Sequence, residues 1–235
     1  MLDDPSRRLM ERAIAKCLKV TPGGLVHDLA RDLGARPELA LLAGSVSELF
    51  YAVCSLTDDL QDGDAEPYLG SIAPALALNV QSHLLCLLAV RADEMVQALG
   101  TVECRGLVVE IYRTGAAMLH GQRMELVRDP WTVETYEAVA RFSAGEQFGM
   151  HLVLGALAAG VDPEPWLRLG RSYGSLLQLV ADNESRDPRL EALAADEVAA
   201  LRDRLTRELE RDSLGLGDRA RDHAQRLMER CQRVV

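Results

Sequence analysis

Three aspartates, Asp58, Asp59 and Asp62, lie within five consecutive residues of the chain. In a helix, Asp58 and Asp62 would be four residues apart and would point from the same face. Like charges at this spacing destabilise an isolated helix, so a cation that bridges the carboxylates would offset their repulsion. Mg²⁺ prefers oxygen ligands and usually completes its coordination with water and substrate phosphate. The spacing therefore predicts a magnesium site that holds a phosphorylated substrate.

A long apolar pattern precedes these aspartates. From about Pro37 to Asp62, large apolar residues recur at three- and four-residue spacing, which predicts a long amphipathic helix that ends at Gly63. An acidic cluster at the end of such a helix would lie at the mouth of a helical bundle. This position favours a metal site over the alternative, a solvated acidic helix end. The D-D-x-x-D spacing alone would be weaker support, because chance produces it in roughly one such protein in ten.

The same helical periodicity covers most of the chain, and no stretch alternates with a period of two over more than a few residues. Proline and glycine turn signals at 129–130, 160–163 and 187–188 separate the segments. No linker rich in Gly, Ser or Pro divides the pattern. We therefore predict that residues 1–235 form a single all-α domain, a large bundle of long helices. The further helices are expected at about 4–19, 71–99, 102–119, 132–159, 164–181 and 195–235.

The composition restricts the partners and the location of the protein. The 235 residues carry a formal net charge of −10 without a basic stripe, so nucleic acid is not an expected partner. Five cysteines are scattered singly, which is typical of reduced thiols, and the N-terminus lacks the apolar segment of a signal peptide. The most apolar stretch, about Ile72 to Val90, contains Asn79 and Gln81 and is interpreted as a buried helix rather than a membrane span. We therefore expect a cytoplasmic protein.

Several segments, taken together, resemble the polyprenyl synthetase family. Residues 55–62 resemble its S-L-x-x-D-D-x-x-D motif, with one residue fewer between Leu56 and Asp58, and residues 121–126 match its G-Q-x-x-D-L motif, with Glu125 in place of Asp. Tyr136 with residues 155–160, and Gly174 with Gln178, match two more of its patterns. The resemblance covers about residues 20–187 in order. It implies an isoprenoid-synthase-type bundle around a central cavity, Mg²⁺ as the cofactor, an allylic prenyl diphosphate as the donor, and a homodimer.

The departures from the family pattern are concentrated among its cations. The family's G-G-K-x-x-R becomes Gly23 to His27 with both cations missing, its R-R-G is absent from residues 65–70, and its Lys-Thr pair becomes Ser143-Ala144. The second D-D-x-x-D aligns with residues 181–185 and retains only Asp182 in register. A diphosphate that stays intact needs several Lys or Arg side chains to neutralise it. The donor is therefore expected to remain an allylic diphosphate, while the acceptor carries no diphosphate.

This combination of kept and lost residues looks like the prenyltransferases of moenomycin-type antibiotic biosynthesis, which add a geranyl unit to a farnesylated phosphoglycolipid. That resemblance implies geranyl diphosphate as the donor, an amphiphilic lipid as the acceptor, and peripheral contact with the inner membrane face. It also implies roles for particular side chains. These are Asp58, Asp59 and Asp62 as catalytic metal ligands; Asp182, Asn183 and Glu184 as ligands of a distal metal; Val53, Cys54, Phe50 and Tyr51 along the prenyl chain; and Gln122, Gln178 and Arg141 as substrate contacts.

Two other functions fit the same residues. A class I terpene cyclase also needs one allylic diphosphate, and Asn183, Asp187 and Glu191 have the spacing of a cyclase's second metal motif. However, Pro188 interrupts the helix that this spacing requires, and aromatic residues, which would shape a cyclising cation, make up 4% of the chain. The second alternative is a catalytically silent subunit of a prenyl synthase. The intact first aspartate motif argues against that alternative.

Overall fold

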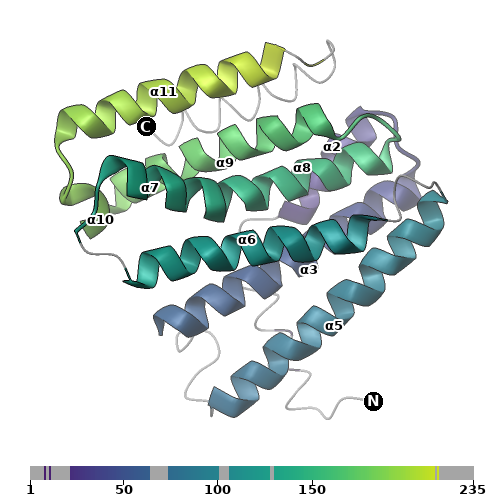
Figure 1. The fold of residues 1–235 in the computed structure, drawn as a ribbon. Helices are drawn as coiled ribbons and strands as arrows, with labels where there is room; N and C mark the ends of the chain where they lie inside the picture. The colour runs from purple at the N-terminus through teal and green to yellow at the C-terminus, as the bar shows by residue number, and fades with distance from the viewer. Residues whose placement is uncertain are drawn as a thin grey trace.

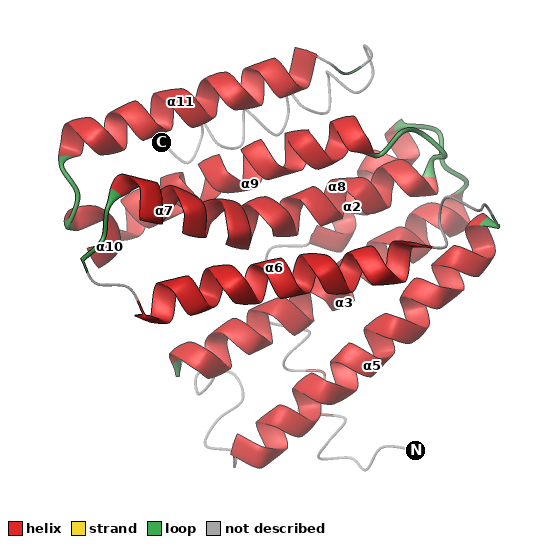
Figure 2. Ribbon diagram, in the orientation of Figure 1, coloured by secondary structure: helices red, strands yellow, loops and turns green. Residues whose placement is uncertain are grey.

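The computed structural model describes residues 22–63, 74–100, 106–127 and 130–214, together with residues 8, 11 and 216. Within these ranges every regular element is a helix (Figure 2), which confirms the all-α prediction. Most of the predicted helix at 4–19, the segment at 64–73, and most of the chain after residue 214 lie outside the described residues. The helices are α2 (Pro22–Asp32), α3 (Pro37–Asp62), α5 (Pro74–Leu99), α6 (Leu107–Val127), α7 (Val133–Ala140), the π-helix η2 (Arg141–Gly145), α8 (Glu146–Ala158), α9 (Glu164–Ser185), α10 (Pro188–Glu191) and α11 (Ala195–Leu214).

Most helices lie side by side in layers, from α11 at one side of the bundle to α5 at the other (Figure 1). Helix α8 is the central element, because it contributes to both groups of buried apolar residues. Its residues Met150 and Leu154 pack with α2, α3, α5 and α6, whereas Leu152 and Ala156 pack with α9 and α11. A helix that is apolar on all sides in this way belongs in the interior.

Close contacts between α9 and the segment before it depend on small residues. Gly170 and Gly174 leave no room for a side chain, since a Cβ atom at Gly174 would lie 2.1 Å from the carbonyl oxygen of Ala144. The segment predicted as one helix over 132–159 is continuous, but its middle is the π-helix η2. Single-turn π segments of this kind change the direction of side chains and often occur at functional sites. Here, Ser143 and Ala144 of η2 line the wall of a cavity.

Two helices, α3 and α5, are long and apolar enough to cross a membrane by length and composition alone, a test that the core helices of soluble proteins also pass. The most apolar window of α3 is 56% buried, whereas that of α5 is only 28% buried. The prediction of a buried helix at about 72–90 is therefore wrong for the isolated chain. The reason is that α5 covers α3 with one side and leaves Leu78, Leu85 and Val90 on its other side exposed.

A buried histidine connects α8 with α3. The Nδ1 atom of His151 shares a hydrogen bond of 2.9 Å with the Ser47 hydroxyl, while Nε2 is buried without a hydrogen-bond partner. The rings of Phe50, Tyr51 and Phe148 surround the imidazole. Burial lowers the pKa of His151 to about 3, so the side chain is neutral in the folded protein.

We predict that His151 makes folding less stable in acid. Its pKa is lower in the folded chain than the ordinary value of 6.5, so below pH 6.5 the unfolded chain takes up a proton that the folded chain does not. Stability is unaffected by this group above pH 6.5 and falls by up to about 1.4 kcal/mol per pH unit between pH 6.5 and 3. Urea unfolding of wild type and His151→Gln at pH 7 and pH 5 measures the effect. The wild type should lose roughly 2 kcal/mol more than the variant, and equal losses would contradict the prediction.

Candidate active site

The first aspartate motif occupies the last two turns of α3. Helix α3 ends as predicted at Gly63, whose φ of 82° is a left-handed conformation that glycine adopts without strain. Asp58 is exposed and lines a cavity of about 520 Å³. Asp62 accepts a hydrogen bond of 3.0 Å from Nε2 of Gln122, and Gln122 lines the same cavity. The prediction that Asp58 and Asp62 share one face of the helix is therefore consistent with their surroundings.

Helices α3, α5, α6, α8 and α9, together with η2, all contribute to this cavity. Val53 and Cys54, one turn before Asp58, line it as predicted, and so does Tyr51. Its lining also contains five glutamines, which are Gln61, Gln81, Gln122, Gln147 and Gln178. None of the described residues that line it is a lysine or an arginine. The cavity therefore combines apolar walls with neutral amide groups, and Asp58 contributes the one carboxylate among its described lining residues.

The aligned second motif, residues 181–185, lies at the end of α9, and Asp182 is its buried carboxylate. Asp182 accepts a hydrogen bond of 2.6 Å from the Tyr136 hydroxyl and bonds of 3.0 Å from Nε2 of Gln178. Burial and the neighbouring Asp182 raise the pKa of Tyr136 far above its ordinary value, so the phenol remains a donor. Gln178, predicted as a substrate contact, lies between Asp182 and the cavity.

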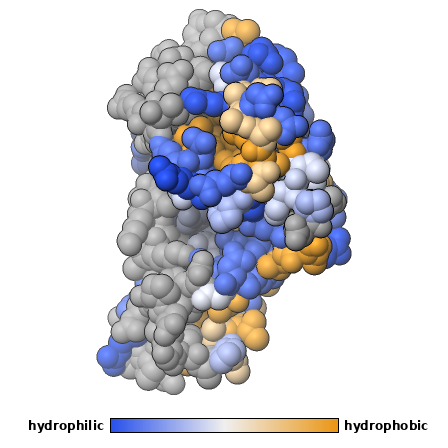
Figure 3. Space-filling model, turned by 90° about the vertical axis from the view of Figure 1, so that its left-hand side faces the viewer, coloured by the Kyte–Doolittle hydropathy of each residue, from blue (hydrophilic) through white to orange (hydrophobic). Residues whose placement is uncertain are grey.

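Glu125 connects the two motifs electrostatically. Burial raises the pKa of Glu125, Arg189 lowers it, and the charges of Asp62, Asp182 and Asp187 raise it further. Because the charges of both Asp62 and Asp182 affect the pKa of Glu125, the ends of α3, α6 and α9 must converge at one end of the bundle. Figure 1 shows these three helix ends on the same side of the molecule. Figure 3 views that side, and in the described part of it hydrophilic residues predominate, with apolar residues gathered in the upper part.

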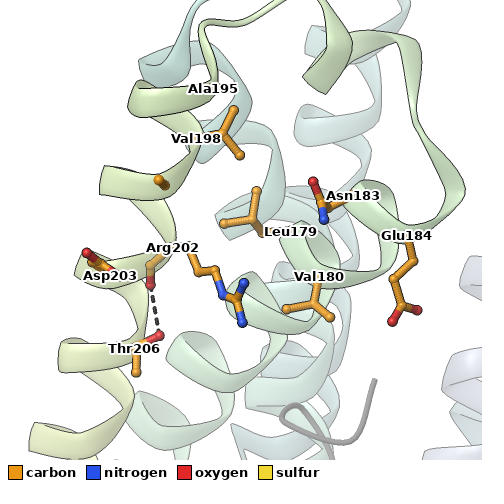
Figure 4. A pocket seen from close by; sticks show the side chains of 10 residues that line it. Leu179, Val180, Asn183, Glu184, Ala195, Val198, Arg202, Asp203 and Thr206 are labelled. Carbon is orange, nitrogen blue, oxygen red and sulfur yellow. Dashed lines mark hydrogen bonds between the residues drawn. The ribbon is translucent and has the colours of Figure 1, made fainter. Parts of the chain in front are cut away.

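Asn183 and Glu184 do not converge with Asp182. Both are exposed and line a different cavity, a groove of about 570 Å³ between α9 and α11 (Figure 4). Consecutive residues of an α-helix point about 100° apart, so three neighbours cannot bind one ion from the same side. The structure therefore corrects the prediction that Asp182, Asn183 and Glu184 act as one set of metal ligands.

Two further predicted contacts also lie elsewhere. Phe50 is 1% exposed, belongs to the core and is not part of the cavity lining. Arg141 forms ion pairs with Glu137 and with Glu208 of α11, and it connects η2 with α11 instead of reaching the cavity. Periodicity placed both residues on plausible helices, but the packing of neighbouring helices turns their side chains away from the site.

Some cavity residues were not identified from the sequence. Gln81 donates a hydrogen bond of 2.7 Å to the Thr57 hydroxyl and so joins α5 to the turn before Asp58. A signal was available for Gln81, because it interrupts the apolar stretch at 72–90. Gln147 and Tyr112 carried no such signal, since which side of their helices faces the cavity depends on the π-helix and on the position of α6.

The chemistry of the first motif fits Mg²⁺, whereas that of the second does not. Asp58, Asp59 and Asp62 offer hard oxygen ligands near the cavity, as Mg²⁺ requires. In the part of the chain that the structure describes, no three His, Cys, Asp or Glu side chains are arranged to hold an ion by themselves. An ion here would need water and substrate oxygens as its remaining ligands, which is how Mg²⁺ is commonly bound. At the second motif, the oxygens of Asp182 already accept hydrogen bonds from protein groups.

No protein-family model and no curated protein sequence match the chain. Among solved structures, it is similar to a geranyltranstransferase from Thermotoga maritima, with a TM-score of 0.75 and 19% identity, covering 96% of this chain and 89% of that one. An isoprenoid synthase family member from Thermotoga neapolitana gives a TM-score of 0.72 and 20% identity, with 96% and 97% covered. A farnesyl diphosphate synthase from T. brucei, bound to a bisphosphonate, gives 0.76 and 15%, with 98% and 91% covered.

Similarity at this level of identity establishes the fold. The chain therefore has the all-α fold of the isoprenoid synthases, as the resemblance of its motifs implied. Coverage of nine tenths or more of this chain in each of these comparisons shows that the similarity extends over the whole bundle.

Proposed function

We propose that this protein is a Mg²⁺-dependent prenyltransferase that moves the prenyl group of an allylic diphosphate, geranyl diphosphate by preference, to an acceptor without a diphosphate. The observation that carries the proposal is the position of Asp58 at, and of Asp62 beside, a cavity of about 520 Å³ whose described lining contains no lysine or arginine. The fold supports prenyl transfer in general. The missing cations support an acceptor that needs no charge neutralisation.

In this mechanism Asp58, Asp59 and Asp62 would bind Mg²⁺, which when bound neutralises the charge that develops on the diphosphate as its bond to the prenyl carbon breaks. Val53 and Cys54 leave space for the prenyl chain. The amides of Gln122 and Gln178 orient polar groups near the carboxylates. An alkene of the acceptor attacks the allylic carbon, a carbon–carbon bond forms, and the proton lost from the acceptor passes to the departing pyrophosphate. Apolar walls exclude the water that would otherwise capture the cation.

The start of α2 supports an acceptor without a diphosphate. The backbone N–H of Gly23 donates a hydrogen bond of 2.9 Å to Oε2 of Glu48, and Oε1 of Glu48 is buried without a hydrogen-bond partner. A carboxylate at this position repels a phosphate group. The segment at 65–70, where the resemblance places other missing cations, lies outside the described residues. We propose that the acceptor is an amphiphilic lipid, specifically a phosphoglycolipid of the moenomycin type, with its polar head outside the cavity.

Product analysis tests this function. The protein is incubated with Mg²⁺ and geranyl or farnesyl diphosphate, each with and without a farnesylated phosphoglycolipid, and products are identified by mass spectrometry. A prenylated lipid that forms only when the acceptor is present supports the proposal. Hydrocarbons released without an acceptor would identify a terpene cyclase, and no product under any condition would favour a catalytically silent subunit.

We further propose that the protein is a cytoplasmic homodimer, with peripheral access to the membrane that carries the acceptor. From Pro74 to Val90, helix α5 has no Asp, Glu, Lys or Arg, and α6, which packs against α5, exposes Val109 and Tyr112. Leu85, Tyr112 and Leu119 are exposed and also line the cavity. A second copy placed on this α5–α6 surface would close the cavity wall to water.

A charged substitution tests the dimer. Leu78→Glu and Val90→Glu place a carboxylate on the α5–α6 surface, and burying it unpaired is costly, so either variant should convert the dimer to a monomer in light scattering after size-exclusion chromatography. Leu214→Glu, at an exposed leucine of α11 outside this surface, should remain a dimer. A wild-type monomer, or dimers in all three variants, would exclude this surface as the interface.

A further inference from the structure

Arg189 lies within the acidic cluster that joins the two motifs. Its guanidinium group bonds to both carboxylate oxygens of Asp187 at 2.8 Å, forms an ion pair with Glu125, and lies 3.4 Å from Oδ2 of Asp182. Its carbon Cζ lies 5.8 Å from the ring centre of Trp131. The side chain is 18% exposed. Three carboxylates from three parts of the chain therefore surround one cation.

A short turn holds Arg189 in this position. Arg186 ends α9 in a left-handed conformation, with φ 55° and ψ 50°, and this reverses the direction of the chain. Asp187 then caps α10, because its Oδ1 accepts a bond of 2.8 Å from the backbone N–H of Arg189. The same oxygen also accepts the bond from Nε. The turn thus directs the guanidinium group of Arg189 back toward the end of α9, beside Asp182.

The charges explain why a cation is needed here. Glu125, Asp182 and Asp187 lie close together and partly buried, and Asp62 is near enough to affect Glu125. Carboxylates that are removed from water repel one another unless a cation compensates them. Arginine suits this position because it cannot lose its proton in a protein and its planar donors can serve several carboxylates at once. A divalent cation would compensate the same charges, but only if the guanidinium group were absent.

We propose that the guanidinium group of Arg189 permanently occupies the position at which the second motif would otherwise bind a metal ion. In this arrangement only the first motif, Asp58, Asp59 and Asp62, recruits Mg²⁺. Arg189 is a positioning residue: it fixes Asp182, and through Asp182 it fixes the buried Tyr136 hydroxyl and the Gln178 amide at the cavity wall. The inference rests on the proposed function only in assigning the Mg²⁺ of the donor to the first motif.

Metal binding without any substrate tests this inference. Mn²⁺ is titrated into wild type and Arg189→Ala, and binding is followed by loss of the electron paramagnetic resonance signal of free Mn²⁺. The variant should bind one more ion than the wild type, because three carboxylates lose their only described cation. With Mn²⁺ at ten times its Kd, the melting temperature of the variant should rise by about 3 °C. In Arg189→Ala/Asp182→Asn the extra ion should be lost, and Arg189→Lys, which keeps the charge, should not gain it.

A matched control and a second measurement decide the outcome. Arg141→Ala removes an arginine that also has two carboxylate partners, Glu137 and Glu208, and should gain no ion. Should Arg189→Ala fail to fold, the variant Asp58→Asn/Asp59→Asn/Asp62→Asn retains Arg189 and is expected to bind no Mn²⁺ at the second motif. Binding in that triple variant that Asp182→Asn abolishes would overturn the proposal, as would an unchanged number of ions in a folded Arg189→Ala. Neither result depends on whether the protein transfers a prenyl group.

Discussion

Replacement of Asp58 by asparagine is expected to reduce prenyl transfer from geranyl diphosphate by at least about a thousandfold, which corresponds to roughly 4 kcal/mol of lost transition-state stabilisation. Asparagine has nearly the shape of aspartate but lacks the negative charge that holds Mg²⁺ against the diphosphate. Asp58 is exposed at the cavity wall and is not part of the apolar core, so the fold should be unaffected. The kcat/KM for the prenylated product and the melting temperature, measured on the same preparation, check both expectations.

Asp58→Asn should not lower the melting temperature of the metal-free protein. Asp58 lies four residues from Asp62 and near the negative end of the α3 dipole, and both effects disfavour a carboxylate. The melting temperature without metal should therefore stay the same or rise. Asp93→Asn changes an aspartate on α5 that is bonded to Gln97 and serves as the matched control with normal activity. Near-normal transfer by Asp58→Asn would remove the basis of the proposed metal site.

The second large effect concerns chain elongation. With isopentenyl diphosphate as the co-substrate, this protein should form no longer prenyl diphosphates at a measurable rate. A bound diphosphate is normally held by several charge-assisted hydrogen bonds of about 1.5–3 kcal/mol each. Loss of three such bonds weakens binding by about 10³- to 10⁶-fold. Here the described cavity lining has no lysine or arginine, and the N–H of Gly23 is bonded to the carboxylate of Glu48.

Liquid chromatography with mass spectrometry measures this prediction. Geranyl diphosphate is incubated with isopentenyl diphosphate in one reaction and with the phosphoglycolipid acceptor in another, using the same enzyme preparation. Product in the second reaction shows that the enzyme is active, so its absence in the first can be interpreted. Efficient formation of farnesyl diphosphate would show that isopentenyl diphosphate binds without the missing cations, and the proposed class of acceptor would then be wrong.

The groove between α9 and α11 is separate from this chemistry. It contains Asn183 and Glu184 from the aligned second motif but not Asp182, and α9 divides it from the cavity of Asp58. Substitution of Asn183 should therefore affect transfer much less than substitution of Asp182. This difference follows from the helical rotation of neighbouring residues, and alignment of the motif alone could not show it.

The features that the sequence predicted well are local ones. An all-α fold followed from periodicity, because the residues that form one helical face recur every three or four positions whatever their tertiary contacts. The end of α3 at Gly63 and the shared face of Asp58 and Asp62 followed from helix geometry and from a residue that tolerates positive φ. Val53 and Cys54 line the cavity because they lie one turn before Asp58 on the same helix, and their contact with the prenyl chain stays a prediction.

Tertiary packing decided the remaining features. Phe50 lies in the core and Arg141 is paired with α11 because neighbouring helices cover those faces. Arg189 lies 64 positions from Glu125 in the sequence, and only the convergence of α6 with the turn after α9 brings their charges together. The amino-acid sequence by itself thus determined which residues form helices and which of them share a face, since both depend on short-range geometry. The tertiary structure decided which faces meet, because that depends on how all the helices pack and on where charges must be compensated.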